Sequence, residues 1–124
     1  MRSLIVAPAD EKRLAEALAS GADALVVNLA LATPDQRPAA RAAAARFLKA
    51  ARARGGGPAL IVGVNALDSG ETDLDLDAVM ASAPDAILLP RSLGGASVQQ
   101  LSAKLAVREA EFALADGATR IIAL

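Results

Sequence analysis

The stretch ALVVNL at Ala24–Leu29 decides the fold of this chain. It is apolar throughout except for Asn28, and an apolar run without polar alternation is typical of a strand covered on both faces. Alanine-rich stretches with helical spacing separate it from four runs of the same kind, which are LIVA at Leu4–Ala7, ALIVGV at Ala59–Val64, AILL at Ala86–Leu89 and RIIAL at Arg120–Leu124. This βαβαβαβαβ order predicts an α/β fold with a parallel sheet.

Capping residues and helix breakers place four helices between these runs. Asp10 is a plausible N-cap for a helix that reaches about Ser20. Thr33-Pro34-Asp35 opens the second helix, with Pro34 at the favoured first position. That helix extends to about Arg54 and ends at the glycine run that follows. The third helix begins near Asp73, and the fourth spans about Val98 to Leu114.

Composition limits the classes of function. The chain has 124 residues, which fits one domain over 1–124 and is about half the ~250 residues of an eight-stranded barrel. A net charge of −1 and an aromatic content of 2% argue against nucleic-acid binding. No apolar stretch approaches the ~20 residues of a membrane span. The absence of cysteine fits a reducing cytoplasm.

The chain also lacks histidine, the commonest general base and metal ligand. Catalysis would therefore need carboxylates, Lys, Arg or a cofactor. The three acidic residues Asp73, Asp75 and Asp77 offer carboxylates at the start of a helix, and two interpretations of them are open. They could ligate a metal, or they could simply favour the helix dipole, and the second interpretation is favoured because no calcium-loop pattern surrounds them.

Ligands of parallel α/β sheets bind at the carboxyl ends of the strands, and three polar residues there are candidates for substrate binding. Asn65 follows the third run and either contacts a ligand or closes a turn with its side chain. Arg91 follows the fourth run and either holds a carboxylate or phosphate by a forked bond or is a solvated cation. Asn28 lies inside an apolar run, where a bond to neighbouring backbone is the favoured explanation.

The sequence resembles the HpcH/HpaI aldolase and citrate lyase beta-subunit family, in its acyl-CoA lyase branch. The segments that carry the resemblance cover essentially the whole chain in order, and they are RSLIVAPAD from Arg2, SGADALVVNL from Ser20, VGVNALDSG from Val62, PDAILLPRS from Pro84 and LAVREAEFALADGATRIIAL from Leu105. The resemblance implies the first half of a TIM barrel, with five strands and four helices. It also implies Mg²⁺-dependent cleavage of a carbon–carbon bond in a citryl, malyl or citramalyl thioester.

The resemblance further implies where the family's catalytic groups would fall. An arginine that stabilises the enolate-like thioester oxygen belongs at Gly63, so no catalytic residue is retained there. The family's acidic Asp-Leu-Glu-Asp segment reads Asn28-Leu29-Ala30-Leu31, and its lysine after the fourth strand is Arg91. The metal-binding glutamate would follow Leu124. Mg²⁺ is therefore expected for the family, but its ligands are not expected within this sequence.

Three interpretations remain open at this point. The chain is the amino-terminal part of a lyase that acts on a CoA thioester or small organic acid, or a non-catalytic half-barrel that binds or interacts, or a small doubly wound domain with an unrelated ligand. The run Arg120–Leu124 is apolar, and no helix follows it in the sequence to cover it. Because an uncovered parallel edge invites association, we expect that the isolated chain forms a homo-oligomer or that it is part of a longer ordered polypeptide.

Overall fold

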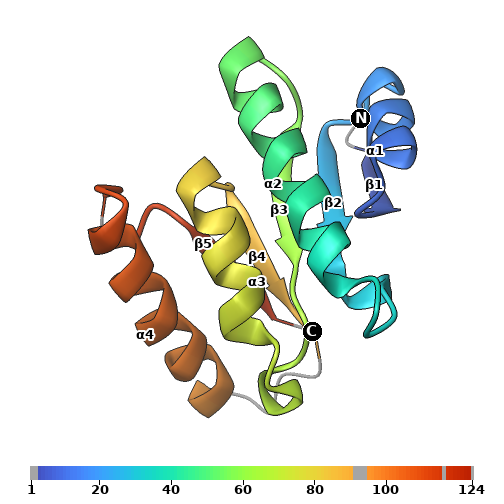
Figure 1. Cartoon of the computed structure of the whole chain (residues 1–124). Coiled ribbons are helices and arrows are strands. Elements are labelled where there is room, and N and C mark those ends of the chain that lie inside the picture. Colours follow the sequence, from blue (N-terminus) through green and yellow to red (C-terminus); the bar gives the residue numbers. More distant parts are fainter. Residues whose placement is uncertain (1–2, 91–94, 116, 124) are drawn as a thin grey trace.

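The computed structural model describes residues 3–90, 95–115 and 117–123. Five parallel strands form one sheet whose spatial order follows the sequence (Figure 1). The strands are β1 (Leu4–Pro8), β2 (Ala24–Asn28), β3 (Ala59–Gly63), β4 (Ala86–Leu89) and β5 (Arg120–Ala123). The predicted parallel α/β fold is confirmed, and each strand overlaps its predicted run.

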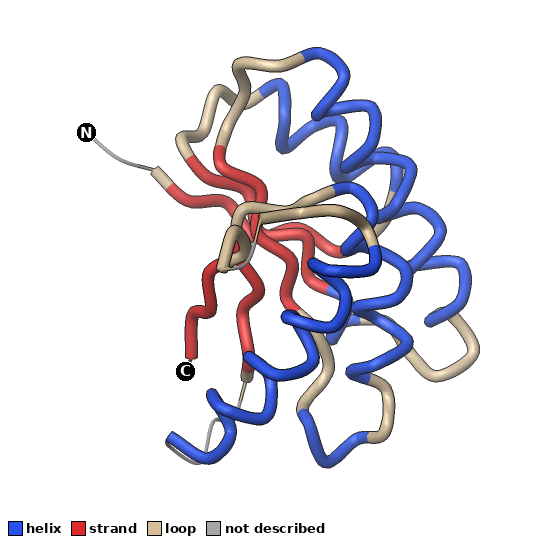
Figure 2. The backbone as a smooth tube through the Cα atoms, turned by 90° about the vertical axis from the view of Figure 1, so that its left-hand side faces the viewer, coloured by secondary structure: helices blue, strands red, loops and turns tan. Residues whose placement is uncertain are grey.

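Four helices connect the strands, and all of them lie on one face of the sheet (Figure 2). The helices are α1 (Glu11–Ala19), α2 (Arg37–Arg54), α3 (Thr72–Val79) and α4 (Gly95–Glu111). A doubly wound domain has helices on both faces and reverses its strand order at a switch point. The sequential order and single helical layer therefore exclude that interpretation and match the first half of a TIM barrel, in which helices surround the strands on the outside.

The main core lies between the sheet and the helices. Alternate residues of each central strand point into it, including Leu25, Val27 and Val62, which are fully buried. The opposite set of side chains forms the open face of the sheet, where Val26, Ile61 and Ala86 make a smaller cluster. Because side chains alternate along a strand, Asn28 lies on the same face as Val26. The open face carries no helix among the described residues.

Helix α1 begins as predicted, because the Asp10 carboxylate accepts a hydrogen bond from the Arg13 N–H at 3.0 Å. The predicted start of α2 is wrong: α2 begins at Arg37, with Pro38 in its first turn. The Thr33-Pro34-Asp35 segment instead forms a turn, in which the Thr33 hydroxyl donates to Asp35 at 2.7 Å. The side-chain bonds of such residues compete with helix formation.

Helix α3 begins at Thr72, next to the predicted position, whereas α4 differs from the prediction at both ends. Helix α4 begins three residues earlier than predicted, at Gly95, and ends at Glu111 rather than Leu114. The chain leaves the helix there because Ala113 adopts a positive φ of 57°.

Strand β5 is the least covered strand, with Ile122 39% exposed. No helix in the described part of the chain is long and apolar enough to cross a membrane.

Candidate functional site

The carboxyl ends of the first four strands present one aligned row of residues on the open face. The strand register pairs Pro8 with Asn28, Asn28 with Gly63, and Gly63 with Leu88. None of these four side chains carries a charge. Within the described residues, this row therefore offers a carboxamide and apolar groups to a ligand.

Asn28 connects this row to the loop that follows β2. Its Oδ1 accepts a hydrogen bond from the Ala30 N–H at 3.0 Å and caps the short 3₁₀ helix Leu29–Leu31. This confirms the prediction that Asn28 bonds to neighbouring backbone. The Nδ2 group of Asn28 has no hydrogen-bond acceptor within the described part of the protein, so it keeps a donor available on the half-buried open face.

Glycine fits position 63 because the Asn28 side chain lies against it. A Cβ atom added to Gly63 would lie 3.0 Å from Asn28 Oδ1 and 3.3 Å from Asn28 Cγ. Such contacts are tighter than nine in ten contacts of real Cβ atoms, so the Asn28 side chain would have to shift by a few tenths of an ångström. The two residues are therefore adapted to each other, and Asn28 occupies the space into which a side chain at position 63 would project.

Asn65 is buried and ties the end of β3 to α3. Its backbone N–H and its Nδ2 group both donate to Asp75 Oδ2, at 2.8 Å and 2.9 Å. Asp75 is itself fully buried, and its Oδ1 accepts from Arg41 Nε at 2.8 Å. The structure therefore gives Asn65 a positioning role, and its predicted contact with a ligand stays a prediction. Sequence reasoning missed Arg41, because its partner lies 34 residues away.

The Arg41 guanidinium lies between two carboxylates. Its Nη2 is 3.2 Å from Glu71 Oε1, and its Nε bonds to Asp75. Burial by itself lowers the pKa of Arg41, but the hydrogen bonds and negative charges of Asp75 and Glu71 outweigh burial and raise it. Arg41 is therefore held as a cation that joins α2 to α3.

The other two acidic residues of α3 pair with α4. Asp73 contacts Lys104 at 2.8 Å and Arg108 at 3.1 Å, and Asp77 contacts Arg108 at 2.9 Å. The hydrogen bond from Lys104, supported by the charges of Lys104 and Arg108, holds the pKa of Asp73 below its ordinary value. The three aspartates thus make ion pairs between helices and do not converge on a metal site.

A pocket of about 420 Å³ lies at the carboxyl ends of β3 and β4. Its lining residues are Ala66, Leu67, Asp68, Leu89, Pro90, Ser97 and Gln100. No motif in the sequence pointed to Ser97 or Gln100, which reach this pocket from α4. Arg91, the third predicted binding residue, lies outside the described residues, although its neighbour Pro90 lines the pocket.

Mg²⁺ prefers several carboxylate, phosphate and water oxygens in an octahedral arrangement. No three acidic, histidine or cysteine side chains come together as a metal site in residues 3–90, 95–115 and 117–123. Asp10 is used as a helix cap, and Asp75 is bonded to Arg41 and Asn65. The described residues therefore do not by themselves form a ligand set that fits Mg²⁺.

Solved structures share this fold over nearly the whole chain. The citrate lyase beta subunit of Mycobacterium tuberculosis, complexed with oxaloacetate and magnesium, is 28% identical, with a TM-score of 0.66 over 97% of this chain and 56% of that one. The same protein in complex with magnesium, acetoacetate and coenzyme A is 28% identical, with a TM-score of 0.66 over 97% of this chain and 47% of that one. Malate synthase of Haloferax volcanii shares the fold at 16% identity, with a TM-score of 0.81 over 98% of this chain and 40% of that one.

The chain spans about half the length of the solved structures it matches. A search of curated proteins finds no match. The sequence profile of the family described as HpcH/HpaI aldolase/citrate lyase matches residues 2–124. The chain therefore belongs to the HpcH/HpaI aldolase/citrate lyase family.

Proposed function

We propose that this chain supplies the substrate-binding part of a citrate-lyase-like carbon–carbon lyase. Its ligand would be a CoA thioester or a small organic acid, bound at the carboxyl ends of β1–β4. The related protein of M. tuberculosis was solved with oxaloacetate, and with acetoacetate and coenzyme A, which supports this class of ligand. The cysteine-free sequence supports a cytoplasmic location.

Our proposal for this site rests on the uncharged row at the strand ends, which consists of Pro8, Asn28, Gly63 and Leu88. The free Nδ2 group of Asn28 would donate a hydrogen bond to a carboxylate or carbonyl oxygen of the ligand. Asn65 and Arg91 would complete the binding set from the next two strands. Stabilising an enolate-like oxygen requires positive charge near that oxygen, and removal of one such donor commonly costs about 10²–10³ in rate. Gly63 cannot supply this charge.

A second candidate function follows from the same row. The close fit of Asn28 to Gly63 favours a non-catalytic half-barrel that binds the ligand without cleaving it. The lyase and binding-module interpretations share the binding step and differ only in turnover. A binding assay and a cleavage assay therefore separate them.

The binding assay is calorimetric titration with acetyl-CoA and with oxaloacetate, each with and without Mg²⁺. We expect Asn28→Ala to weaken binding of the ligand whose oxygen it contacts by about tenfold, which corresponds to one hydrogen bond of about 1.4 kcal/mol. Gln99→Ala is the matched control, because Gln99 is exposed on α4 and does not line the pocket. Absence of binding by the wild-type chain would contradict both family-based interpretations.

The cleavage assay follows malyl-CoA and citramalyl-CoA with Mg²⁺. It compares the wild-type chain with Gly63→Arg, and with Gly63→Arg combined with Asn28→Ala to make room for the new side chain. Turnover by any of the three supports the lyase proposal. Binding without turnover in all three favours the non-catalytic module.

We further propose that the chain forms a homo-oligomer through the open face of the sheet. Large apolar side chains are exposed on the two edge strands, with Leu4 59%, Val6 52% and Ile122 39% exposed. Because no helix among the described residues covers this face, its exposed apolar side chains form a surface for a second copy of the chain. Sedimentation at micromolar concentration should show a species larger than a monomer, and Val6→Asp should shift it toward the monomer. A monodisperse wild-type monomer would contradict this proposal.

A further inference from the structure

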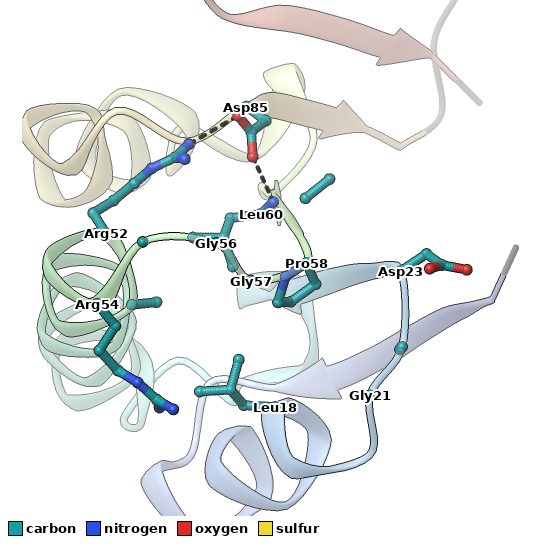
Figure 3. Close-up of a pocket in the computed structure, with 14 residues that line it drawn as sticks. Leu18, Gly21, Asp23, Arg52, Arg54, Gly56, Gly57, Pro58, Leu60 and Asp85 are labelled. Carbon is teal, nitrogen blue, oxygen red and sulfur yellow. Dashed lines mark hydrogen bonds and ion pairs between the residues drawn. The ribbon is translucent and has the colours of Figure 1, made fainter.

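Another pocket, of about 730 Å³, lies at the opposite edge of the sheet, near the amino ends of β2, β3 and β4 (Figure 3). Its walls come from the end of α1, the end of α2 and the glycine run Gly55–Gly57. Its volume falls within the range of small-molecule sites. The pocket plays no part in the function proposed above, because it does not adjoin the carboxyl ends of the strands.

Most of the charged groups in this pocket already have partners. Arg52 Nη2 lies 3.0 Å from Asp85 Oδ1, and Asp85 Oδ2 accepts from the Leu60 N–H at 2.7 Å (Figure 3). Asp23 Oδ2 accepts from the Ser3 N–H at 2.9 Å. The Asp85 carboxylate is therefore paired with a cation, whereas Asp23 accepts a backbone hydrogen bond and has no cationic partner among the described residues.

Of the two arginines that line the pocket, Arg54 is the one without a partner in the described part of the chain. Its guanidinium has no acidic partner and no hydrogen-bond acceptor among the described residues. Figure 3 shows the Arg54 side chain extending from the end of α2 toward Leu18, away from the pair of Arg52 and Asp85. The Arg54 side of the pocket therefore carries an unpaired positive charge, while Asp23 lies on the opposite side of the pocket (Figure 3).

Two backbone donors add to that charge. The N–H groups of Gly56 and Gly57 have no acceptor in the described part of the chain, whereas the Gly55 N–H bonds to the carbonyls that end α2. A Cβ atom placed on Gly56 or Gly57 would meet nothing within 4 Å, so a ligand can approach their backbone closely. Unsatisfied N–H groups beside a cation favour an anion.

We propose that this pocket binds the oxyanion group of a small molecule, phosphate or carboxylate, through Arg54 and the N–H groups of Gly56 and Gly57. A guanidinium suits this ligand because its planar fork matches the oxygens of both groups. Leu18 and Pro58 form an apolar wall for the remainder of the ligand. The proposal stands apart from the lyase proposal, because the two pockets share no lining residue.

A purely structural role for Arg54 has a different signature. A cation in the last turn of a helix interacts favourably with the helix dipole, and Arg54 occupies that position in α2. Such a role would make Arg54 a determinant of stability and would leave anion binding unaffected by its removal. Measuring both quantities separates the two roles.

The test is a titration of the full ¹⁵N-labelled chain with inorganic phosphate and, separately, with acetate at constant ionic strength. We expect saturable amide shifts at Gly56 and Gly57 with at least one of the two anions, which also identifies the preferred oxyanion. Arg54→Gln should weaken that binding at least tenfold, while Arg54→Lys should retain part of it. Lys49→Gln is the control, because it removes the same charge from an exposed position of α2 outside the pocket.

Two results would overturn the proposal. One is the lack of saturable shifts at Gly56 and Gly57 with either anion. The other is equal binding by Arg54→Gln and Lys49→Gln, which would reduce the effect to general screening of charge. Far-ultraviolet circular dichroism of each variant confirms that it is folded, so a loss of binding reports on the pocket.

Discussion

Replacement of Asp75 by asparagine should destabilise the protein far more than the same change at Asp77, two residues along the same helix. Asp75 is fully buried, with its Oδ1 bonded to Arg41 Nε at 2.8 Å and its Oδ2 bonded to two N–H groups of Asn65 at 2.8 Å and 2.9 Å. An asparagine side chain has one acceptor oxygen and one NH₂ group. In either orientation, the NH₂ group would therefore face a donor, from Arg41 or from Asn65.

The size of the effect follows from these contacts. Loss of one partner of a buried ion pair costs about 3–5 kcal/mol, and a buried donor without an acceptor costs about 1–3 kcal/mol. We therefore expect Asp75→Asn to lower the free energy of unfolding by about 3–4 kcal/mol, a large part of the 5–15 kcal/mol that is typical of a folded domain. The Asp77 side chain is 60% exposed and pairs with Arg108 near the surface. Its replacement should cost less than about 1 kcal/mol.

The assay is urea unfolding at pH 7, followed by far-ultraviolet circular dichroism because the chain has no Trp or Tyr. Protein concentration must be the same for all variants, because association would add to apparent stability. A difference between Asp75→Asn and Asp77→Asn of less than about 1 kcal/mol would refute the reasoning. Failure of Asp75→Asn to fold at all would mark the upper end of the expected loss.

Three further predictions concern the row at the strand ends and the ion pairs of α4. Gly63→Ala should lower the free energy of unfolding in urea by about 1 kcal/mol, because its Cβ crowds the Asn28 side chain. This cost should disappear in an Asn28→Ala background, and equal costs in both backgrounds would contradict the close fit. The hydrogen bond from Lys104 is the chief cause of the lowered pKa of Asp73. The ionised Asp73 therefore stabilises the fold above about pH 4, and this stabilisation is lost as the pH falls through the lowered pKa. An acid unfolding curve for Asp73→Asn that matches the wild type would count against this. Arg108→Ala should cost about 2 kcal/mol, since Arg108 is buried among two carboxylates and two carbonyl groups, whereas Lys104→Ala should cost less than about 1 kcal/mol; similar losses in thermal or urea unfolding would remove the distinction.

Local patterns predicted most of the secondary structure correctly and failed where short polar side chains act locally. The runs at Ala24–Leu29 and Ala86–Leu89 became strands because neither has polar alternation, and Asp10 became an N-cap because its side chain reaches the first turn. The start of α2 was predicted from Pro34, but Thr33 bonds to Asp35 and delays the helix to Arg37. A proline is compatible with both a turn and a helix start, so the sequence could not distinguish them.

Contacts between distant residues decided the roles of the candidate site residues. The sequence left open whether the Asn65 side chain contacts a ligand or closes a turn, and in the structure its amide donates to Asp75, which also pairs with Arg41. The sequence placed Gly63 at a family position and could not show that Asn28 lies against it. These pairings link positions 10 to 35 residues apart, and no local spacing encodes them.

By itself, the sequence determined the parallel α/β fold, the membership of the family and the lack of a charged group at Gly63, because these depend on apolar runs, motif order and residue identity. Only the tertiary structure decided that all four helices cover one face, that Asp75 is the buried acceptor between α2 and β3, and that Arg54 remains unpaired beside Gly56 and Gly57. Burial and hydrogen-bond partners depend on which surfaces meet in space, and that is fixed only when the helices pack against the sheet.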